Sequence, residues 1–155
     1  MNNTPELRFQ SLELSLPPAP APQGVYKSFL QIDKYVYVSG HGPLLPNNTY
    51  IKGSVGIDMD KEAGKLAARQ VGLAILATLK ANLGSLDKID RVVKVLGMVA
   101  CASNFKKHPY VINGCSELFA QIFGADKGIG VRSAVGMNSL PEGIPVEIEA
   151  LFLLK

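Results

Sequence analysis

Three charged side chains stand inside two apolar segments near the C-terminus. Arg132 lies in VRSAVGM, and Glu147 and Glu149 lie in VEIEALF. Charged side chains are rarely buried unless they are paired or used, so their position needs a reason. An arginine can grip a carboxylate through a fork of N–H donors, and a glutamate can orient or deprotonate a water. These residue types predict a carboxylate clamp, in which Arg132 holds an anionic substrate and Glu147 acts on a water.

The apolar spacing around these charges predicts an antiparallel hairpin of two strands, over 130–138 and 145–154. In this register Glu149 lies one residue pair from Arg132, and Glu147 lies further along, at roughly 13 Å for a rise of ~3.4 Å per residue. All three charges are then expected on one face of the sheet, with space for a small molecule between them. The alternative is a cross-strand salt bridge on a solvated face, worth about 0.5 kcal/mol and without further function.

The elements that must position these residues are predicted from periodicity. Residues 1–15 are expected to hold an extended N-terminal strand region, because apolar and polar residues alternate from Leu12 to Leu16. Asp33 and Lys34 mark the turn of a hairpin. Further segments are expected as helices over 60–83 and 110–124 and as a strand over 89–102. The order predicts one α+β domain over 1–155, with a mixed, mostly antiparallel sheet and two helices on one face.

Composition narrows the class of protein. The chain has 47% hydrophobic and 19% charged residues and a net charge of +3, which is typical of a globular domain. Its basic residues are scattered, so a nucleic-acid partner is not expected. Cys101 and Cys115 form no C-x-x-C pair, which favours reduced thiols and a cytoplasmic location. The longest apolar stretch contains Thr78 and Lys80 and falls short of the roughly 20 residues that cross a bilayer.

Several segments, in this order, resemble the Rid or YjgF family of reactive-intermediate deaminases, which are endoribonuclease L-PSP-like proteins. The resemblance runs from about Leu16 to Leu154, and the last segment is the most specific. The segments are GVYKS, VYVSGHGPL, AARQVGLAILATL, VVKVLGMVACASNF, VINGCSELF, VRSAV and LPEGIPVEIEALF. The resemblance implies a chorismate-mutase-like fold and a homotrimer whose sites lie in clefts between subunits.

The resemblance also implies roles for individual residues. Arg132 would bind the substrate carboxylate, and Glu147 would position the hydrolytic water. The other implied substrate-binding residues are Tyr26, Ser39, Gly40 and Asn113. The implied activity is a hydrolase that converts 2-aminoacrylate or 2-iminopropanoate to a 2-keto acid and ammonia. Because an imine carbon is already electrophilic, no metal or cofactor is expected.

Two departures from the family pattern indicate a divergent subgroup. Ala134 stands where the best-characterised members carry cysteine, and His41 stands where glutamine is common. His41 is expected either to donate a proton in the pocket or to be a hydrogen-bonded turn histidine. Besides the deaminase, two functions stay open: a non-catalytic regulatory trimer that binds small carboxylates, and a ribonuclease or translation inhibitor. A chorismate mutase would need further positive charge, from Arg69 or Arg91 of a neighbouring subunit.

Overall fold

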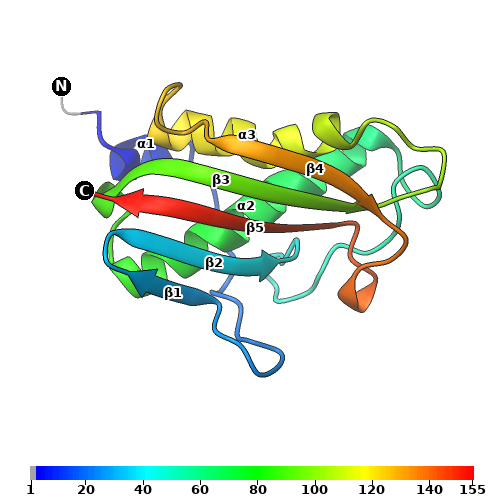
Figure 1. The fold of residues 1–155 in the computed structure, drawn as a ribbon, viewed down its shortest axis with the longest axis horizontal. Coiled ribbons are helices and arrows are strands. Elements are labelled where there is room, and N and C mark those ends of the chain that lie inside the picture. The colour runs from blue at the N-terminus through cyan, green and yellow to red at the C-terminus, as the bar shows by residue number, and fades with distance from the viewer. Residues whose placement is uncertain (1–2) are drawn as a thin grey trace.

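One five-stranded sheet, in the order β1-β2-β5-β3-β4, forms the body of the protein. The structure is a computed structural model that describes residues 3–155. The helices are α1 (Pro5–Ser11), α2 (Lys61–Leu83) and α3 (His108–Phe123). The strands are β1 (Phe29–Ile32), β2 (Tyr35–His41), β3 (Ile89–Ala100), β4 (Val131–Met137) and β5 (Val146–Leu154), with short 3-10 turns at Leu86–Lys88 and Pro141–Gly143. Figure 1 shows α2 and α3 side by side behind one face of the sheet, which confirms the predicted α+β architecture.

The predicted hairpin between 130–138 and 145–154 is wrong. Strand β4 pairs in parallel with β3, and β5 pairs antiparallel with β3 and β2, so β3 lies between the two segments. Helix α3 supplies the crossover that a parallel pair requires. Both segments are strands, as the alternation of apolar residues predicts, but that alternation does not specify which strand lies beside which.

The N-terminal region differs from the expected strand, although residues 1 and 2 lie outside the described part of the chain. Residues 5–11 form helix α1, whose first turn is capped by the Thr4 hydroxyl and begins with Pro5. Both are typical helix-start residues. Phe9 is buried in the core, and the carboxylate of Glu6 accepts from the backbone N–H of Leu86 and pairs with Lys80. Helix α1 therefore packs on the ends of the other helices rather than extending the sheet.

Helices α2 and α3 pack closely and cover the core. The side chain of Asp60 caps α2, and Gly84 ends it in a left-handed conformation. A Cβ at Gly114 of α3 would lie 3.0 Å from the backbone nitrogen of Arg69 in α2, so glycine permits this close approach. No helix among residues 3–155 is long and apolar enough to cross a membrane.

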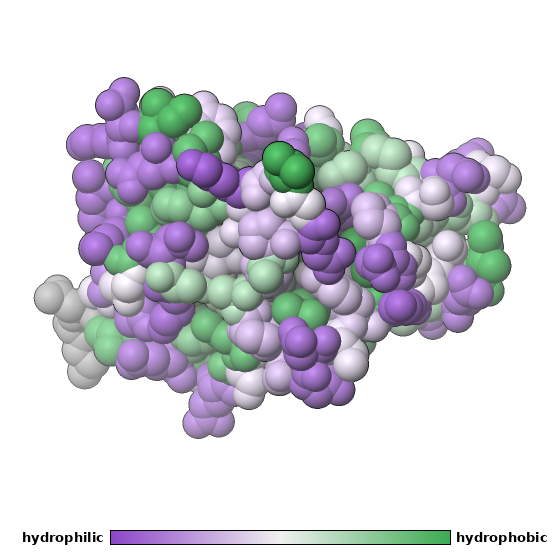
Figure 2. All heavy atoms as spheres, turned by 90° about the horizontal axis from the view of Figure 1, so that it is seen from below, coloured by the Kyte–Doolittle hydropathy of each residue, from purple (hydrophilic) through white to green (hydrophobic). Residues whose placement is uncertain are grey.

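The second face of the sheet carries large side chains that no helix covers. Tyr35 and Tyr37 of β2 are 45% and 47% exposed, and Leu30 of β1 and Val131 of β4 are also exposed. Phe29 of β1 points to the other face and packs against the hydrophobic core. Seen from below Figure 1, along the β1 edge, hydrophobic and hydrophilic residues are interspersed in small groups (Figure 2). Exposed apolar residues are therefore not gathered into one large patch along this edge.

Candidate functional site

The six predicted site residues fall into two groups on one chain. Four of them line a cavity of about 330 Å³, which we call the Glu147 cavity: Tyr26, Ser39, Gly40 and Glu147. The remaining two, Asn113 and Arg132, line a pocket of about 350 Å³, which we call the Arg132 pocket. The structure therefore brings the predicted residues together as two half-sites and not as one site.

The two half-sites lie on opposite faces of the sheet. Val95 of β3 pairs with both Arg132 and Ala150, so all three side chains point toward the helices. Glu147 pairs instead with Met98, and neighbouring residues along a strand point to opposite faces. The expectation that Arg132 shares a face with the two glutamates is therefore wrong, and so is its expected pairing with Glu149. The physical reason is that β3 lies between β4 and β5. The facing of residues on β4 and β5 is therefore set by their separate pairings with β3 and not by a direct pairing with each other.

A β-bulge in β2 shapes the floor of the Glu147 cavity. Val38 pairs with Ala150 and His41 pairs with Ile148, so Ser39 and Gly40 together face a single residue of β5. Such bulges re-aim side chains and are frequent next to active sites. The bulge places Ser39 and Gly40 on the cavity wall.

Gly40 makes room for the carboxylate of Glu147. A Cβ at position 40 would overlap Oε1 of Glu147 and would lie 2.9 Å from its Cδ. Real Cβ atoms are essentially never this close to another heavy atom. The resemblance implied a role for Gly40 as a pocket residue, and the structure gives the steric reason for a glycine at this point.

The pKa of the Glu147 carboxyl is raised above its ordinary value, first by burial and second by the negative charge of Glu149. Both effects disfavour the ionised form. A carboxyl whose pKa moves toward neutrality is better suited to exchange a proton with water than an exposed glutamate. The environment of Glu147 therefore supports the role of a proton-handling group.

The hydroxyl of Ser39 is buried and has no hydrogen-bond partner within residues 3–155. A buried polar atom without a partner costs about 1–3 kcal/mol, so a polar group of a bound molecule would be favoured beside it. Tyr26 lies on the loop before β1, and its hydroxyl accepts from the backbone N–H of Gln23 at 3.1 Å. The loop is joined to β2 because the N–H of Ser39 donates to the carbonyl of Ser28.

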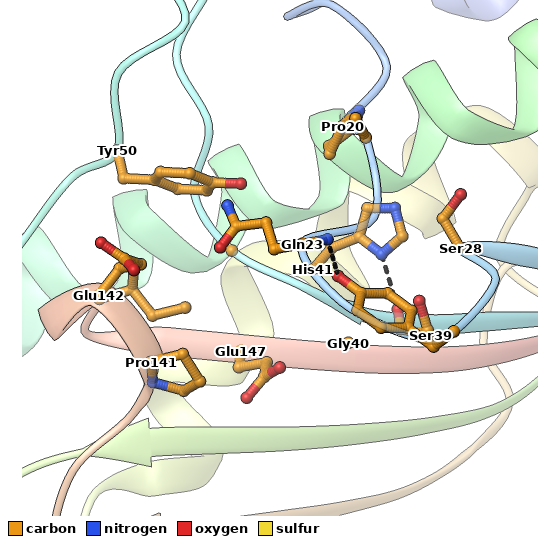
Figure 3. A pocket seen from close by; sticks show the side chains of 14 residues that line it. Pro20, Gln23, Ser28, Ser39, Gly40, His41, Tyr50, Pro141, Glu142 and Glu147 are labelled. Carbon is orange, nitrogen blue, oxygen red and sulfur yellow. Dashed lines mark hydrogen bonds between the residues drawn. The ribbon is translucent and has the colours of Figure 1, made fainter.

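The far end of the cavity is formed by residues that the sequence did not indicate. Figure 3 shows Tyr50 and Glu142 at one end of the cavity, Ser28 and Ser39 at the other, and Glu147 below them. The pKa of the Tyr50 hydroxyl is raised, first by burial and then by the charges of Tyr26 and Glu142. Tyr50 lies in an irregular loop and Glu142 in a 3-10 turn, which carry no periodic pattern, so only the fold could reveal them.

His41 lines the Glu147 cavity, but its ring is buried and both of its nitrogens are in hydrogen bonds. Its side chain is 3% exposed, with Nδ1 2.6 Å from the carbonyl oxygen of Ser39 and Nε2 2.7 Å from the hydroxyl of Thr78. Burial lowers its pKa, while the bond to the Ser39 carbonyl opposes this shift. A neutral imidazole satisfies both contacts if Nδ1–H donates to the carbonyl and Nε2 accepts from the hydroxyl. His41 therefore ties the bulge of β2 to helix α2.

In the Arg132 pocket, the hydrogen-bond partners of the guanidinium group within residues 3–155 are all neutral. Nη1 donates to Oδ1 of Asn113 at 2.8 Å and to the hydroxyl of Ser116 at 3.2 Å, and Nη2 lies 3.4 Å from the carbonyl oxygen of Pro109. Helix α3 supplies all three partners, and they orient the group without neutralising its charge. Within residues 3–155 no carboxylate forms an ion pair with this guanidinium, and Glu117, which lines the pocket, pairs with Lys65. An oriented guanidinium without an ion-pair partner is suited to bind a carboxylate. Among residues 3–155, no three His, Cys, Asp or Glu side chains gather as metal ligands.

Comparison with known proteins identifies one protein family whose sequence model matches this chain and a solved structure with the same fold. The sequence model of a family described as "YjgF/chorismate_mutase-like, putative endoribonuclease" matches residues 6–141. A protein of unknown function from Agrobacterium tumefaciens has a solved structure with a TM-score of 0.87 and 37% identity, covering 98% of this chain and 94% of that one.

Two curated relatives differ in what their names say. Protein TCP17 of Trypanosoma cruzi is 36% identical over 142 residues, which cover 92% of this chain and 89% of the relative. A 2-iminobutanoate/2-iminopropanoate deaminase of Dermatophagoides farinae is 29% identical over 143 residues, covering 92% of this chain and 95% of the relative. The second name states an activity for that relative, and the first states none.

Proposed function

Because the chain belongs to the YjgF/chorismate-mutase-like family, we propose that it hydrolyses small enamine and imine intermediates of the 2-aminoacrylate and 2-iminopropanoate type. The products are a 2-keto acid and ammonia. The observation that carries this proposal is the pair of half-sites: an uncompensated guanidinium at Arg132 and a proton-handling carboxyl at Glu147. One suits the substrate carboxylate and the other suits the attacking water.

Since these half-sites lie on opposite faces of one sheet, the working site joins two subunits. The Arg132 pocket of one subunit then faces the Glu147 cavity of its neighbour in a homotrimer. The uncovered sheet face with Tyr35 and Tyr37 supports such an assembly, because large exposed apolar surfaces commonly mark interfaces. A sedimentation mass of roughly three times 16.6 kDa is expected, and a monomer mass would contradict the joined site.

The chemistry requires positioning more than a strong nucleophile. Arg132 holds the substrate carboxylate. The electrophilic carbon of the imine, whose nitrogen is protonated, lies toward the Glu147 cavity. Glu147 orients a water and accepts its proton as oxygen attacks that carbon. The carbinolamine then collapses, and nitrogen leaves as ammonia after it receives a proton. Hydrolysis adds one water and transfers no electrons, so the protein contributes orientation and exclusion of bulk solvent.

The acidic character of the cavity weighs against a ribonuclease. Glu142 and Glu147 both line it, and two carboxyl groups oppose the approach of a phosphate chain. Binding of RNA would depend steeply on salt through contacts with clustered basic side chains. The basic residues of this chain are scattered.

A non-catalytic carboxylate-binding trimer is the second candidate. Ala134 packs against the core near the Arg132 pocket, in the position where the family resemblance places a cysteine. If that thiol is needed for turnover, the same site would bind small carboxylates and release them unchanged. The assay below separates the two functions.

The test is the loss of freshly generated 2-iminopropanoate, followed with and without the protein. The wild type is expected to accelerate hydrolysis, while Arg132→Ala and Glu147→Gln lose most of this effect. Matched controls are Arg91→Ala, a partly exposed arginine on β3, and Glu62→Gln, an exposed glutamate in the first turn of α2. Both controls should stay near wild type. No acceleration by the folded wild type, together with measurable binding of pyruvate, would establish the second candidate instead.

A further inference from the structure

A cysteine and a histidine outside both half-sites form a hydrogen-bonded pair. Cys101 follows the end of β3 and His108 is the first residue of α3, and Sγ lies 3.4 Å from Nε2. A nucleophile within hydrogen-bond reach of a base is the arrangement that activates thiols in proteins. The loop between β3 and α3 brings the two side chains together from positions seven residues apart.

The orientation of the pair is fixed by its neighbours. The ring of Phe105 meets the imidazole of His108 edge-on, with centroids 5.2 Å apart and planes at 86°. On the other side, a Cβ at Gly136 of β4 would lie 2.6 Å from Nε2 of His108 and 3.2 Å from Sγ of Cys101. A glycine at this position therefore leaves the space that the pair occupies.

The pair opens into a cavity of its own. This cavity measures about 330 Å³ and is also lined by Ser103 and Asn138. Its lining residues are all different from those of the Glu147 cavity and the Arg132 pocket. Cys101 is partly exposed, whereas Cys115, the second cysteine of the chain, is fully buried. A small molecule can therefore reach one thiol and not the other.

The location of the cavity favours negative charge that develops during a reaction. It lies where the parallel strands β3 and β4 end. Helix α3 begins at the same point, and its N-cap residue Lys107 makes no side-chain hydrogen bond to the first turn. The free positive end of a 16-residue helix is thus directed toward this region.

Burial raises the pKa of the Cys101 thiol. The resting sulfur is therefore a protonated thiol, and a neighbouring group must take its proton when sulfur reacts. His108 is within hydrogen-bond reach of that sulfur. Such a pair offers both parts that conjugate addition requires: a sulfur for one end of a polarised double bond and a proton for the other. The polar side chains of Ser103 and Asn138 can meet the oxygen on which charge develops.

We propose that Cys101 and His108 form a thiol-reactive site that captures small α,β-unsaturated carbonyl compounds as covalent thioether adducts. Sulfur bonds to the β-carbon while the S–H proton passes to Nε2 of His108, and the resulting enolate takes a proton at the α-carbon. The carbon–carbon double bond becomes single, no group leaves, and neither oxidant nor reductant is needed. The site acts independently of the Arg132 pocket and the Glu147 cavity.

The probe for this site is N-ethylmaleimide, added to the native full-length protein near neutral pH and followed by intact-protein mass spectrometry. We expect one adduct, located on Cys101 by peptide mapping. His108→Asn should slow its formation by about tenfold or more, because the base is lost. Cys115→Ser, Arg132→Ala and Glu147→Gln should each keep the wild-type rate, and Cys101→Ser should form no adduct while folded.

An unchanged rate in His108→Asn overturns the proposal, and so does an adduct that forms first on Cys115. If circular dichroism shows that His108→Asn is unfolded, Gly136→Ala decides the matter. Its added methyl group would separate Nε2 from Sγ, so the rate should fall in this variant as well. A folded Gly136→Ala protein that reacts as fast as the wild type contradicts the paired site.

Discussion

The carboxylate of Glu147 lies where a side chain on residue 40 would have to be. A Cβ at Gly40 would overlap Oε1 of Glu147 and approach its Cδ to 2.9 Å. The bulge of β2 therefore leaves the space that the Glu147 side chain of β5 occupies. The position of this proposed catalytic carboxyl depends on the absence of a side chain at Gly40.

Substitution Gly40→Ala should therefore displace the Glu147 carboxylate and lower kcat/KM by about 100-fold, the order expected for a misplacement of about 1 Å. A double-mutant cycle in unfolding free energy tests the cause. In a Glu147→Ala background the added methyl group has room, so Gly40→Ala should be less destabilising there than in the wild type. Equal destabilisation in both backgrounds would show that the two residues are not coupled.

Replacement of Glu147 by glutamine should lower the activity and raise the stability of the fold. Because the folded-state pKa of Glu147 is raised, the ionised carboxylate destabilises the fold at pH values above that pKa. Glu147→Gln should consequently melt at a higher temperature than the wild type at pH 8. The difference should shrink as the pH falls, since the carboxyl is protonated in both states below its unfolded value of about 4.3. A melting temperature below that of the wild type at pH 8 would contradict a desolvated carboxylate.

His41 should stabilise the fold through its two hydrogen bonds. Removing its ring in His41→Ala leaves the Ser39 carbonyl and the Thr78 hydroxyl without their partner. The expected loss of unfolding free energy in urea is about 2–4 kcal/mol. His41→Gln can reach both groups and should recover part of the loss. If alanine and glutamine destabilise equally, these two hydrogen bonds do not hold the bulge.

The same histidine makes stability depend on pH. Its folded-state pKa is lowered, so below the unfolded value of about 6.5 the unfolded chain binds a proton that the folded chain does not. Wild-type stability should therefore decline as the pH falls from 7 to 5, and melting curves should show a smaller decline for His41→Gln. An identical decline in the two proteins would assign the effect to other groups.

Asn113 should control substrate binding through the orientation of Arg132. The bond from Nη1 to Oδ1 of Asn113 is 2.8 Å long, and a hydrogen bond to a charged group is worth about 1.5–3 kcal/mol. Asn113→Ala should raise KM about tenfold and change kcat less. The exposed Gln121 on the same helix provides the control, and Gln121→Ala should match the wild type. A fall in kcat with an unchanged KM would contradict this role.

Local patterns in the sequence predicted most of the elements, because periodicity reports which residues face the core. Helices α2 and α3 and strand β3 lie close to the predicted segments, and the turn at Asp33 joins β1 to β2. The start of α1 was misjudged as strand, although Thr4 followed by Pro5 is a helix-start pattern. Short helices are decided by tertiary contacts, here those of Phe9 and Glu6, which local alternation does not report.

The sequence predicted which residues belong to the site but not how they are arranged in space. Six residues were expected in one pocket, and they occupy two half-sites because β3 lies between β4 and β5. Strand order depends on long-range pairing, which the spacing of residues within a segment does not encode. Tyr50 and Glu142 were missed because irregular loops and turns bring them to the cavity.

The most direct test of the joined site uses two inactive variants in one trimer. Arg132→Ala and Glu147→Gln subunits are unfolded, mixed in equal amounts and refolded together, and hydrolysis of 2-iminopropanoate is measured. If each site takes Arg132 from one subunit and Glu147 from the next, random mixing restores about one quarter of the sites, and hence about one quarter of wild-type activity. Separately refolded variants should stay inactive. No recovery in mixed trimers of confirmed composition would contradict a site shared between subunits.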